Sequence, residues 1–264
     1  MTVFFQRPLE VLPLGVGDAF SSKDYYTSMI VVGGRTLCQV DCPDPIHKVL
    51  AERATCLEEP ISARHIDHIL LTHLHGDHCG GLESLLFYRK FVIDAPPPTI
   101  HTIAEIAEAL WSEKLAVSMA GTHMPETGMD QTFTAEDFYR IRLIRAGASF
   151  AIGDLRFEIR RTIHSVPTFG FRVQLDETPP PPATRRMFGY SCDTVFDRNH
   201  IVFLSKADLI FHECSRGGIH TAYSDLLAIS PEIRSKMHIL HLADDFDREH
   251  SELPIVKPGV LYAV

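Results

Sequence analysis

The sequence predicts an α/β sandwich in which two mixed β-sheets pack face to face and helices cover their outer faces. Strand-rich and helix-rich stretches each occur twice along the 264 residues, and no linker-like segment separates the two halves. The composition, with 45% hydrophobic and 22% charged residues, is that of an ordinary globular protein. We therefore expect one domain over residues 1–264, because a single core between two sheets satisfies both halves.

The first half begins with three predicted strands, at residues 10–16, 27–32 and 35–40. Helical spacing of apolar residues follows over 44–55, and residues 65–72 have the pattern of a short buried strand. These elements predict a β-meander that leads through one helix into a buried strand.

The middle of the chain is predicted to be mainly helical. One helix is expected at residues 82–90, and three prolines at 96–98 precede another. The second helix is indicated by five apolar residues that share one helical face: Ile100, Ile103, Ala107, Leu110 and Trp111. A further helix start is expected at Thr134. We interpret residues 96–140 as a helical insertion.

Strands return in the second half. Residues 140–175 are strand-rich, with a hairpin turn expected at Gly153-Asp154 and a stiff proline-rich excursion at 179–182. The remaining elements alternate: predicted strands lie at 187–191, 209–211 and 237–242, and predicted helices at 199–206 and 223–229.

Composition narrows the class of protein. A net charge of -9 argues against binding of long nucleic acid, which requires clustered Lys and Arg. No apolar run reaches the roughly 18 residues of a membrane span, and the first residues lack the pattern of a signal peptide. The six cysteines form no CxxC pair, which is typical of free thiols in a reducing compartment. We expect a cytoplasmic protein with no membrane association.

The segment His73-Leu74-His75-Gly76-Asp77-His78 contains three imidazoles and a carboxylate. These ligands suit Zn, Mn, Fe or Ni. The segment lies between a predicted strand and a helix, so His73 and His75 project the same way while the turn at Gly76 frees Asp77 and His78 for a neighbouring position. The pattern therefore predicts two divalent ions, and zinc is the expected metal. The alternative is a surface loop that is rich in histidine by chance.

This segment matches the HxHxDH motif of the metallo-β-lactamase superfamily, and the resemblance extends over nearly the whole chain. Three further segments resemble the ribonuclease Z-like phosphodiesterase branch. Residues 14–20 (LGVGDAF) resemble its LGxGxA start, residues 190–194 (YSCDT) its YSGDT, and residues 211–215 (FHECS) its HEAT segment. The resemblance implies the αββα metallo-β-lactamase fold.

The resemblance also implies a ligand set. Metal one would take His73, His75 and His164, metal two would take Asp77, His78 and His241, and Asp193 would bridge them. Alternatives remain for three positions. His164 could be a lone core histidine, and Asp193 could cap a turn. His238 competes with His241 on the opposite strand face; we choose His241 because it ends the strand.

The same resemblance implies phosphoryl chemistry. Two divalent ions roughly 3.5 to 4 Å apart hold a shared hydroxide and stabilise the attacking and leaving oxygens, with Asp77 and Asp193 orienting the nucleophile. His212 beside Glu213 is expected to act as general acid, because Glu213 would hold the imidazole and favour its charged form. The alternative is that His212 and Glu213 form a surface pair at a strand end.

Several departures from ribonuclease Z bear on the substrate. The sequence has no long Gly-rich arm and no PxKxxR-like loop, residues 218–221 (GIHT) resemble GHST only loosely, and Cys192 replaces a glycine. We therefore expect a small or cyclic nucleotide phosphodiester as the substrate. The alternatives are a lactone, thioester or other carbonyl, RNA 3′-end processing, and metal binding without turnover. The resemblance also implies a homodimer.

Overall fold

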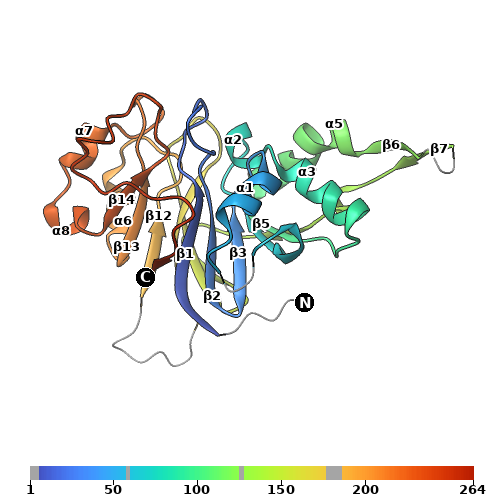
Figure 1. The fold of residues 1–264 in the computed structure, drawn as a ribbon, viewed down its shortest axis with the longest axis horizontal. Helices are drawn as coiled ribbons and strands as arrows, with labels where there is room; N and C mark the ends of the chain where they lie inside the picture. Colours follow the sequence, from blue (N-terminus) through green and yellow to red (C-terminus); the bar gives the residue numbers. More distant parts are fainter. Residues whose placement is uncertain (1–5, 58–59, 125–127, 177–185) are drawn as a thin grey trace.

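Two mixed β-sheets form the centre of the computed structural model, which describes residues 6–57, 60–124, 128–176 and 186–264. The first sheet has the strand order β15-β1-β2-β3-β4-β5-β8, and the second has the order β14-β13-β12-β11-β10-β9. Helices lie on the outer side of each sheet (Figure 1). The predicted α/β sandwich is confirmed.

The first sheet is antiparallel from β15 to β3 and parallel from β3 to β8. Its strands are β1 (Arg7–Gly15), β2 (Ser28–Gly34), β3 (Thr36–Val40), β4 (His68–Leu70), β5 (Thr99–Thr102), β8 (Arg140–Leu143) and β15 (Tyr262–Ala263). The four strands that the sequence predicts before residue 73 are all present.

The second sheet is antiparallel from β9 to β12 and parallel from β12 to β14. Its strands are β9 (Ser149–Ile152), β10 (Leu155–Arg161), β11 (Phe169–Leu175), β12 (Met187–Tyr190), β13 (Leu209–Glu213) and β14 (Met237–Leu240). The expected hairpin turn between β9 and β10 is confirmed, with Gly153 at a φ of 52°. The expected excursion at residues 179–182 lies outside the described residues.

The helices fall into two groups (Figure 1). On the side of the first sheet are α1 (Ile46–Arg53), α2 (Gly76–Cys79), α3 (Leu82–Phe87), α4 (Ala104–Ala109) and α5 (Ala116–Met119). On the side of the second sheet are α6 (Arg198–Leu204), α7 (Tyr223–Leu227) and α8 (Pro231–Arg234). Short 3-10 helices lie at Ala63–His65 (η1) and Ala135–Asp137 (η4). Among the described residues, no helix has both the length and the apolar character that a membrane crossing requires.

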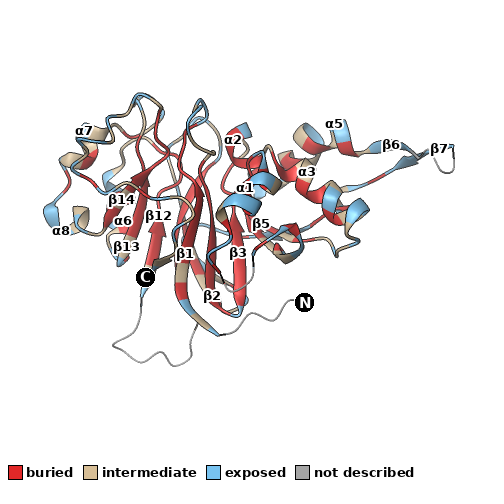
Figure 2. Ribbon diagram, in the orientation of Figure 1, coloured by how far each residue is buried: buried red, intermediate tan, exposed pale blue. Residues whose placement is uncertain are grey.

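The interface between the sheets is the largest buried region (Figure 2). Aromatic side chains of the second sheet form its centre: Phe157 and Phe171 have ring centroids 5.5 Å apart, and Phe188 and Phe211 5.0 Å. Their tilted ring contacts add to the stabilisation from apolar burial. This core fixes the two sheets relative to each other.

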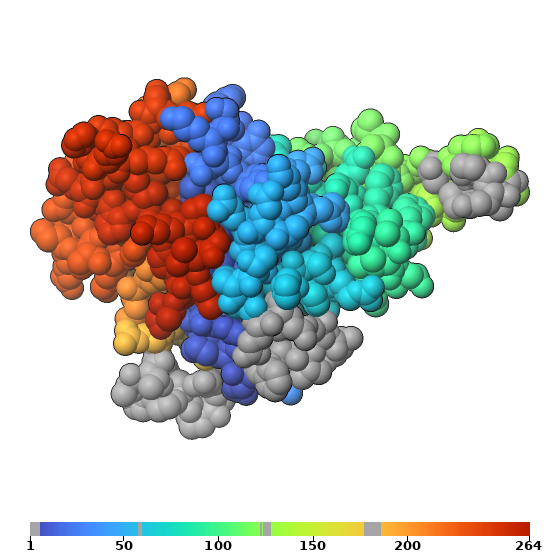
Figure 3. All heavy atoms as spheres, in the orientation of Figure 1, coloured from blue at the N-terminus to red at the C-terminus, as the bar shows by residue number. Residues whose placement is uncertain are grey.

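Residues 96–140 differ from the expected helical insertion. Ile100, expected on a helix face, lies in β5, a buried strand next to β4, and α4 begins only at Ala104. Two π-helical segments also occur, η2 (Tyr88–Val92) after α3 and η3 (Leu110–Leu115) after α4. The segment also contains a hairpin, β6 (Gly121–Met124) and β7 (Met129–Thr132), that projects from one end of the molecule (Figure 3).

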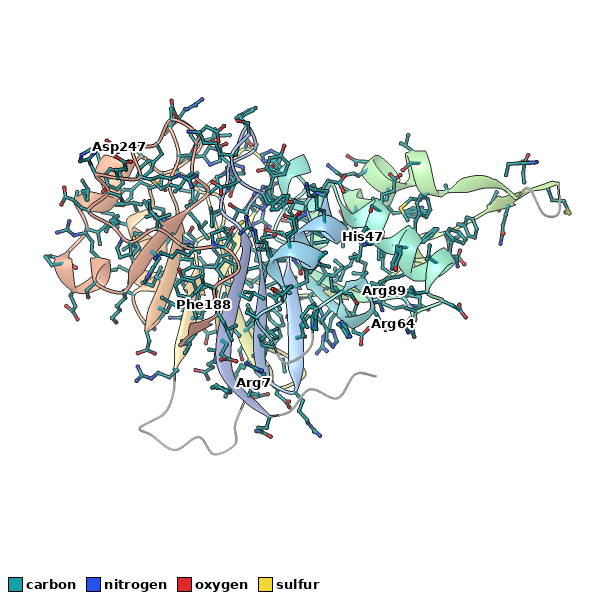
Figure 4. The ribbon with its side chains drawn as sticks, in the orientation of Figure 1. Arg7, His47, Arg64, Arg89, Phe188 and Asp247 are labelled. Carbon is teal, nitrogen blue, oxygen red and sulfur yellow. The ribbon has the colours of Figure 1, made fainter. Side chains whose placement is uncertain are left out.

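Arg89 of η2 joins Pro96, at the start of this region, to residues 63–67. Its side chain is 2% exposed and donates hydrogen bonds to Asp67 Oδ1 (2.9 Å) and to the backbone oxygens of Ala63 (2.7 Å) and Pro96 (2.8 Å). Figure 4 shows it beside Arg64, whose backbone oxygen it also contacts. Two segments, residues 63–67 and the loop at Pro96, therefore share one buried guanidinium.

Arg89→Ala should lower the free energy of unfolding by about 3 to 5 kcal/mol, since it leaves these buried acceptors without a partner. Denaturant unfolding measures the change. Arg64→Ala is the control, because only the backbone oxygen of Arg64 takes part. Equal stability of the two variants would contradict this role of Arg89.

Candidate metal centre

The seven predicted ligands lie together where loops leave the carboxyl ends of strands in both sheets. The segment 73–78 follows β4, His164 follows β10, Asp193 follows β12 and His241 follows β14. Their donor atoms form two groups, each with all atoms within 4.8 Å of one another. One group is His73, His75, His164 and Asp193, and the other is Asp77, His78, Asp193 and His241. Asp193 is common to both.

The carboxylate of Asp193 lies in the middle of the imidazoles. Its Oδ2 is 3.8 Å from His73 Nε2, 3.7 Å from His164 Nε2 and 3.4 Å from His241 Nε2. Its Oδ1 is 3.4 Å from His78 Nε2. Oδ2 therefore lies near imidazoles of both groups and Oδ1 near His78, so the carboxylate as a whole contacts both groups, as a bridging ligand would.

Several of these atoms are buried without a hydrogen-bond partner. They are the Nε2 atoms of His73, His78 and His241, and Oδ1 of Asp193. A buried polar atom without a partner costs about 1 to 3 kcal/mol, so four of them in one place need an explanation. Divalent cations would satisfy them together, and imidazole nitrogens with carboxylate oxygens are donors that such cations accept. The residues present fit a pair of metal ions.

A second layer of polar groups orients the imidazoles. Asp41, just after β3, receives a hydrogen bond from His78 Nδ1 at 2.8 Å and others from the backbone nitrogen and hydroxyl of Thr72. His241 Nδ1 lies 3.3 Å from Thr27 Oγ1. Such partners fix the ring orientation and leave the other nitrogen free for a metal. Asp41 was not predicted from the sequence.

Electrostatics favours the ligand forms of most of these groups. Burial lowers the pKa of His73 and of His241, so both imidazoles are neutral. Burial raises the pKa of Asp193, but the nearby imidazoles of His241, His78 and His73 outweigh it and hold that pKa well below its ordinary value. Asp193 is therefore ionised, as a metal ligand must be.

The backbone is strained at this place. Asp41, Cys192 and His241 have φ angles of 57°, 52° and 60°. These angles lie in the left-handed region, which residues other than glycine disfavour. Cys192 stands where the resemblance to YSGDT has a glycine, which explains the conformation there. Strain of this kind concentrates at functional sites, where surrounding contacts hold the residues in place.

Asp41→Asn should weaken metal binding about 10- to 100-fold, because it removes the charge that orients His78. Asparagine tolerates the positive φ of this position, so the fold should persist. Competition with a chelator of known affinity measures the change. Asp154→Asn, at a carboxylate that accepts a hydrogen bond from the Arg35 backbone in another part of the chain, is the control. An unchanged affinity in Asp41→Asn would exclude this role.

Glu213 pairs with a histidine that the sequence analysis did not select. Its Oε1 accepts hydrogen bonds from His220 Nδ1 at 3.1 Å and from the backbone nitrogen of Thr194 at 2.8 Å. His220 Nδ1 also lies 3.9 Å from Asp193 Oδ2. The His220 ring is 5.2 Å from the His164 ring and 5.1 Å from the His241 ring. The Glu213–His220 pair therefore adjoins both groups of candidate ligands.

The expected pairing of Glu213 with His212 is wrong. The two residues are consecutive in β13, so their side chains point to opposite faces of the sheet. His212 Nδ1 donates to the backbone oxygen of Glu213 at 2.7 Å, and burial lowers the pKa of His212 to about 4. It is a buried neutral histidine, not the charged partner of a carboxylate.

His220, and not His212, has the raised pKa that pairing with Glu213 was expected to produce. Burial lowers its pKa, but the hydrogen bond to Glu213 and the charges of Glu213, Asp193 and Asp77 outweigh burial and raise the pKa above its ordinary value. Its loop folds back toward the site through Gly217 and Gly218, whose φ angles of 82° and 75° favour glycine. The two adjacent glycines before His220 were the sequence signal for such a loop.

The chain matches a known family over almost its whole length. The model for "Anti-Pycsar protein Apyc1" matches residues 9–261. An Apyc1 protein of Bacillus phage 010DV004 is 29% identical over 254 residues, covering 92% of each chain. A cAMP/cGMP-dependent 3′,5′-cAMP/cGMP phosphodiesterase B of Dictyostelium discoideum is 25% identical over 205 residues, which are 71% of this chain and 16% of that protein.

Solved structures share the fold. The metallo-β-lactamase fold protein YhfI of Bacillus subtilis superposes with a TM-score of 0.73 at 18% identity, covering 97% of this chain and 99% of YhfI. Yeast PDE1 superposes with a TM-score of 0.69 at 12% identity and covers the whole of both chains. The expected metallo-β-lactamase fold is confirmed.

Proposed function

Because the chain belongs to the family of Anti-Pycsar protein Apyc1, we propose that it is a metal-dependent phosphodiesterase that hydrolyses cyclic nucleotides. The observation that carries the proposal is the position of the Glu213–His220 pair beside two groups of ligands that share Asp193. The relative from Dictyostelium, which is named for its action on cAMP and cGMP, supports the same substrate class.

The proposed ligands divide as the sequence resemblance implied. His73, His75 and His164 would hold one ion, Asp77, His78 and His241 the other, and Asp193 would bind both. The donor groups and their unpartnered buried atoms support this division. Zinc is the proposed metal, since it accepts nitrogen and oxygen donors, as Mn, Fe and Ni also do.

The proposed mechanism assigns a task to each group of residues. When bound, the ions would supply a water activated at neutral pH and positive charge near the attacking and leaving oxygens. Asp77 and Asp193 orient the attacking water. His220, held in its charged form by Glu213, gives a proton to the leaving ribose oxygen. Glu213 keeps the imidazole in place through its bond to Nδ1, so Nε2 carries the transferable proton.

This proton donor favours a phosphodiester over a carbonyl substrate. A ribose alkoxide is a poor leaving group and needs a proton as the bond to phosphorus breaks. The net charge of -9 favours a small substrate over long RNA.

A substrate panel tests the proposal. Metal-loaded protein should convert cAMP and cGMP to nucleoside monophosphates and should hydrolyse bis-p-nitrophenyl phosphate. It should turn over lactones, thioesters and precursor tRNA far more slowly. Efficient hydrolysis of a lactone or thioester with no action on cyclic nucleotides would overturn it.

A homodimer in the cytoplasm is also proposed. Leu143, in the edge strand β8 of the first sheet, is 59% exposed, and Val117 of α5 and Met129 of β7 are 89% and 67% exposed. Exposed apolar side chains at a sheet edge are typical of surfaces that a second copy covers. The six free cysteines support a reducing compartment. Light scattering that gives the monomer mass would exclude the dimer.

A further inference from the structure

A pocket of about 390 Å³ lies beside the candidate metal centre. Its lining includes Leu74, which lies between two proposed ligands in the chain, and Val166, two residues after His164. The opposite wall comes from α4 and η3, with Ile106, Ala109 and Glu113. The pocket is therefore lined by residues of both ligand loops, and none of its lining residues is a proposed metal ligand or the proposed proton donor.

The pocket walls are attached to the ligand loops by polar contacts. Lys114 Nζ, also in the lining, donates to the backbone oxygen of Leu74 at 2.8 Å. On the other loop, Ser165 Oγ lies 3.3 Å from His75 Nε2. Arg161 near the end of β10 pairs with Glu105 of α4 at 2.6 Å. These contacts hold the pocket at a fixed place relative to the metal ligands.

The lining has the chemistry that recognises a nucleobase. Leu74, Ile106, Ala109 and Val166 present apolar surface to the faces of a flat ring. At the rim, the carboxylate of Glu113 can accept a hydrogen bond from a ring or amino N–H. The ammonium of Lys114 has three protons and uses one on Leu74, so it can donate to a ring nitrogen or carbonyl oxygen.

We infer that this pocket binds the base of the cyclic nucleotide while the phosphate lies at the metal centre. The inference rests on the proposed function. In a cyclic nucleotide the base is joined to the reacting phosphate through one ribose, so a base site must adjoin the phosphate site. Two of the residues that line the pocket, Leu74 and Val166, are next to or two residues from proposed ligands in the chain, and its apolar walls would bury both faces of the ring.

Ala109→Phe tests the inference because it fills the pocket from α4. Two substrates separate the base from the chemistry: cAMP, and ribose 3′,5′-cyclic phosphate, which has the same phosphodiester and no base. The variant should raise KM for cAMP about tenfold or more and change kcat/KM for the abasic substrate less than about twofold. Ala104→Phe is the control, because Ala104 is an exposed residue of the same helix and does not line the pocket.

Glu113→Ala gives a second test. Glu113 is exposed, so its removal should not change the stability of the fold. Loss of one hydrogen bond to the base should raise KM for cAMP about 3- to 10-fold, with Glu108→Ala on α4 as the matched control. Adenosine, which has no phosphate, should inhibit the abasic reaction competitively in the wild type and much more weakly in Ala109→Phe.

Three results would overturn the inference: unchanged KM for cAMP in both variants, equal losses on both substrates, or no inhibition by adenosine. These results leave the proposed function intact if the wild type hydrolyses both cyclic substrates. A wild type that hydrolyses neither would instead refute the proposed function.

Discussion

His220→Ala is expected to lose roughly 10²- to 10⁴-fold in turnover of cAMP while it binds both metal ions normally. The residue is paired through Nδ1 with Glu213 and is the proposed proton donor to the ribose oxygen. The loss should shrink markedly on bis-p-nitrophenyl phosphate, because p-nitrophenolate departs without a proton. Glu213→Gln should show a milder form of the same pattern.

The comparison of the two substrates is the measurement, with metal content determined on the same samples. His212→Ala is the control at the neighbouring position in β13. Since His212 is buried and bonds only to a backbone oxygen among the contacts described for its side chain, any loss in that variant should be equal on both substrates. A loss in His220→Ala that is equal on both substrates would show that His220 does not donate the proton.

Asp193→Asn should weaken the binding of both metal ions by more than about 100-fold, since partners one layer further from a metal already contribute 10- to 100-fold. The carboxylate faces both donor groups, and asparagine keeps its shape but not its charge. Activity on every substrate should fall in proportion to the lost metal, which distinguishes this variant from His220→Ala.

Metal analysis after dialysis, at matched protein concentration, measures the loss in Asp193→Asn. Asp154→Asn is again the control. A variant that keeps two ions and loses only turnover would show that Asp193 is not a shared ligand, and the division of the site into two groups around it would fail.

Four of the proposed ligands could be predicted from the sequence because the motif that contains them is local. His73, His75, Asp77 and His78 lie within six residues, so a strand end and one tight turn bring them together whatever the rest of the chain does. His164, Asp193 and His241 were placed by their order in a resembling family, and the fold then brings their loops to one edge of two sheets.

The partner of Glu213 could not be read from adjacency in the sequence. His212 is next to it in the chain but on the other face of β13, whereas His220 comes back to it through a loop with two glycines in a left-handed conformation. The alternation of side chains along a strand excludes His212 as the partner of Glu213. Identifying His220 as the partner also requires knowing the path of that loop, which the sequence does not give. Asp41 was missed for a similar reason. Its proposed role of orienting His78 depends on a tertiary hydrogen bond and not on a sequence motif.

The start of the chain segment at β5 shows that the spacing of apolar residues alone can predict the wrong element. Ile100 has helical spacing with Ile103 and Ala107, but the segment Thr99–Thr102 is short, follows three prolines and completes the parallel side of the first sheet next to β4. Pairing with that neighbour decides its conformation, because a short apolar run fits a buried strand as well as a helix.

Hydrolysis of cAMP in ¹⁸O-labelled water tests whether the protein is a metal-dependent phosphodiesterase. Metal-loaded protein should form a nucleoside monophosphate with one labelled oxygen on phosphorus. Removal of the metal should abolish the product, and added metal should restore it. Mass spectrometry of the product measures the label. Failure to form the monophosphate, or equal formation by the metal-free protein, would show that the protein is not a metal-dependent phosphodiesterase.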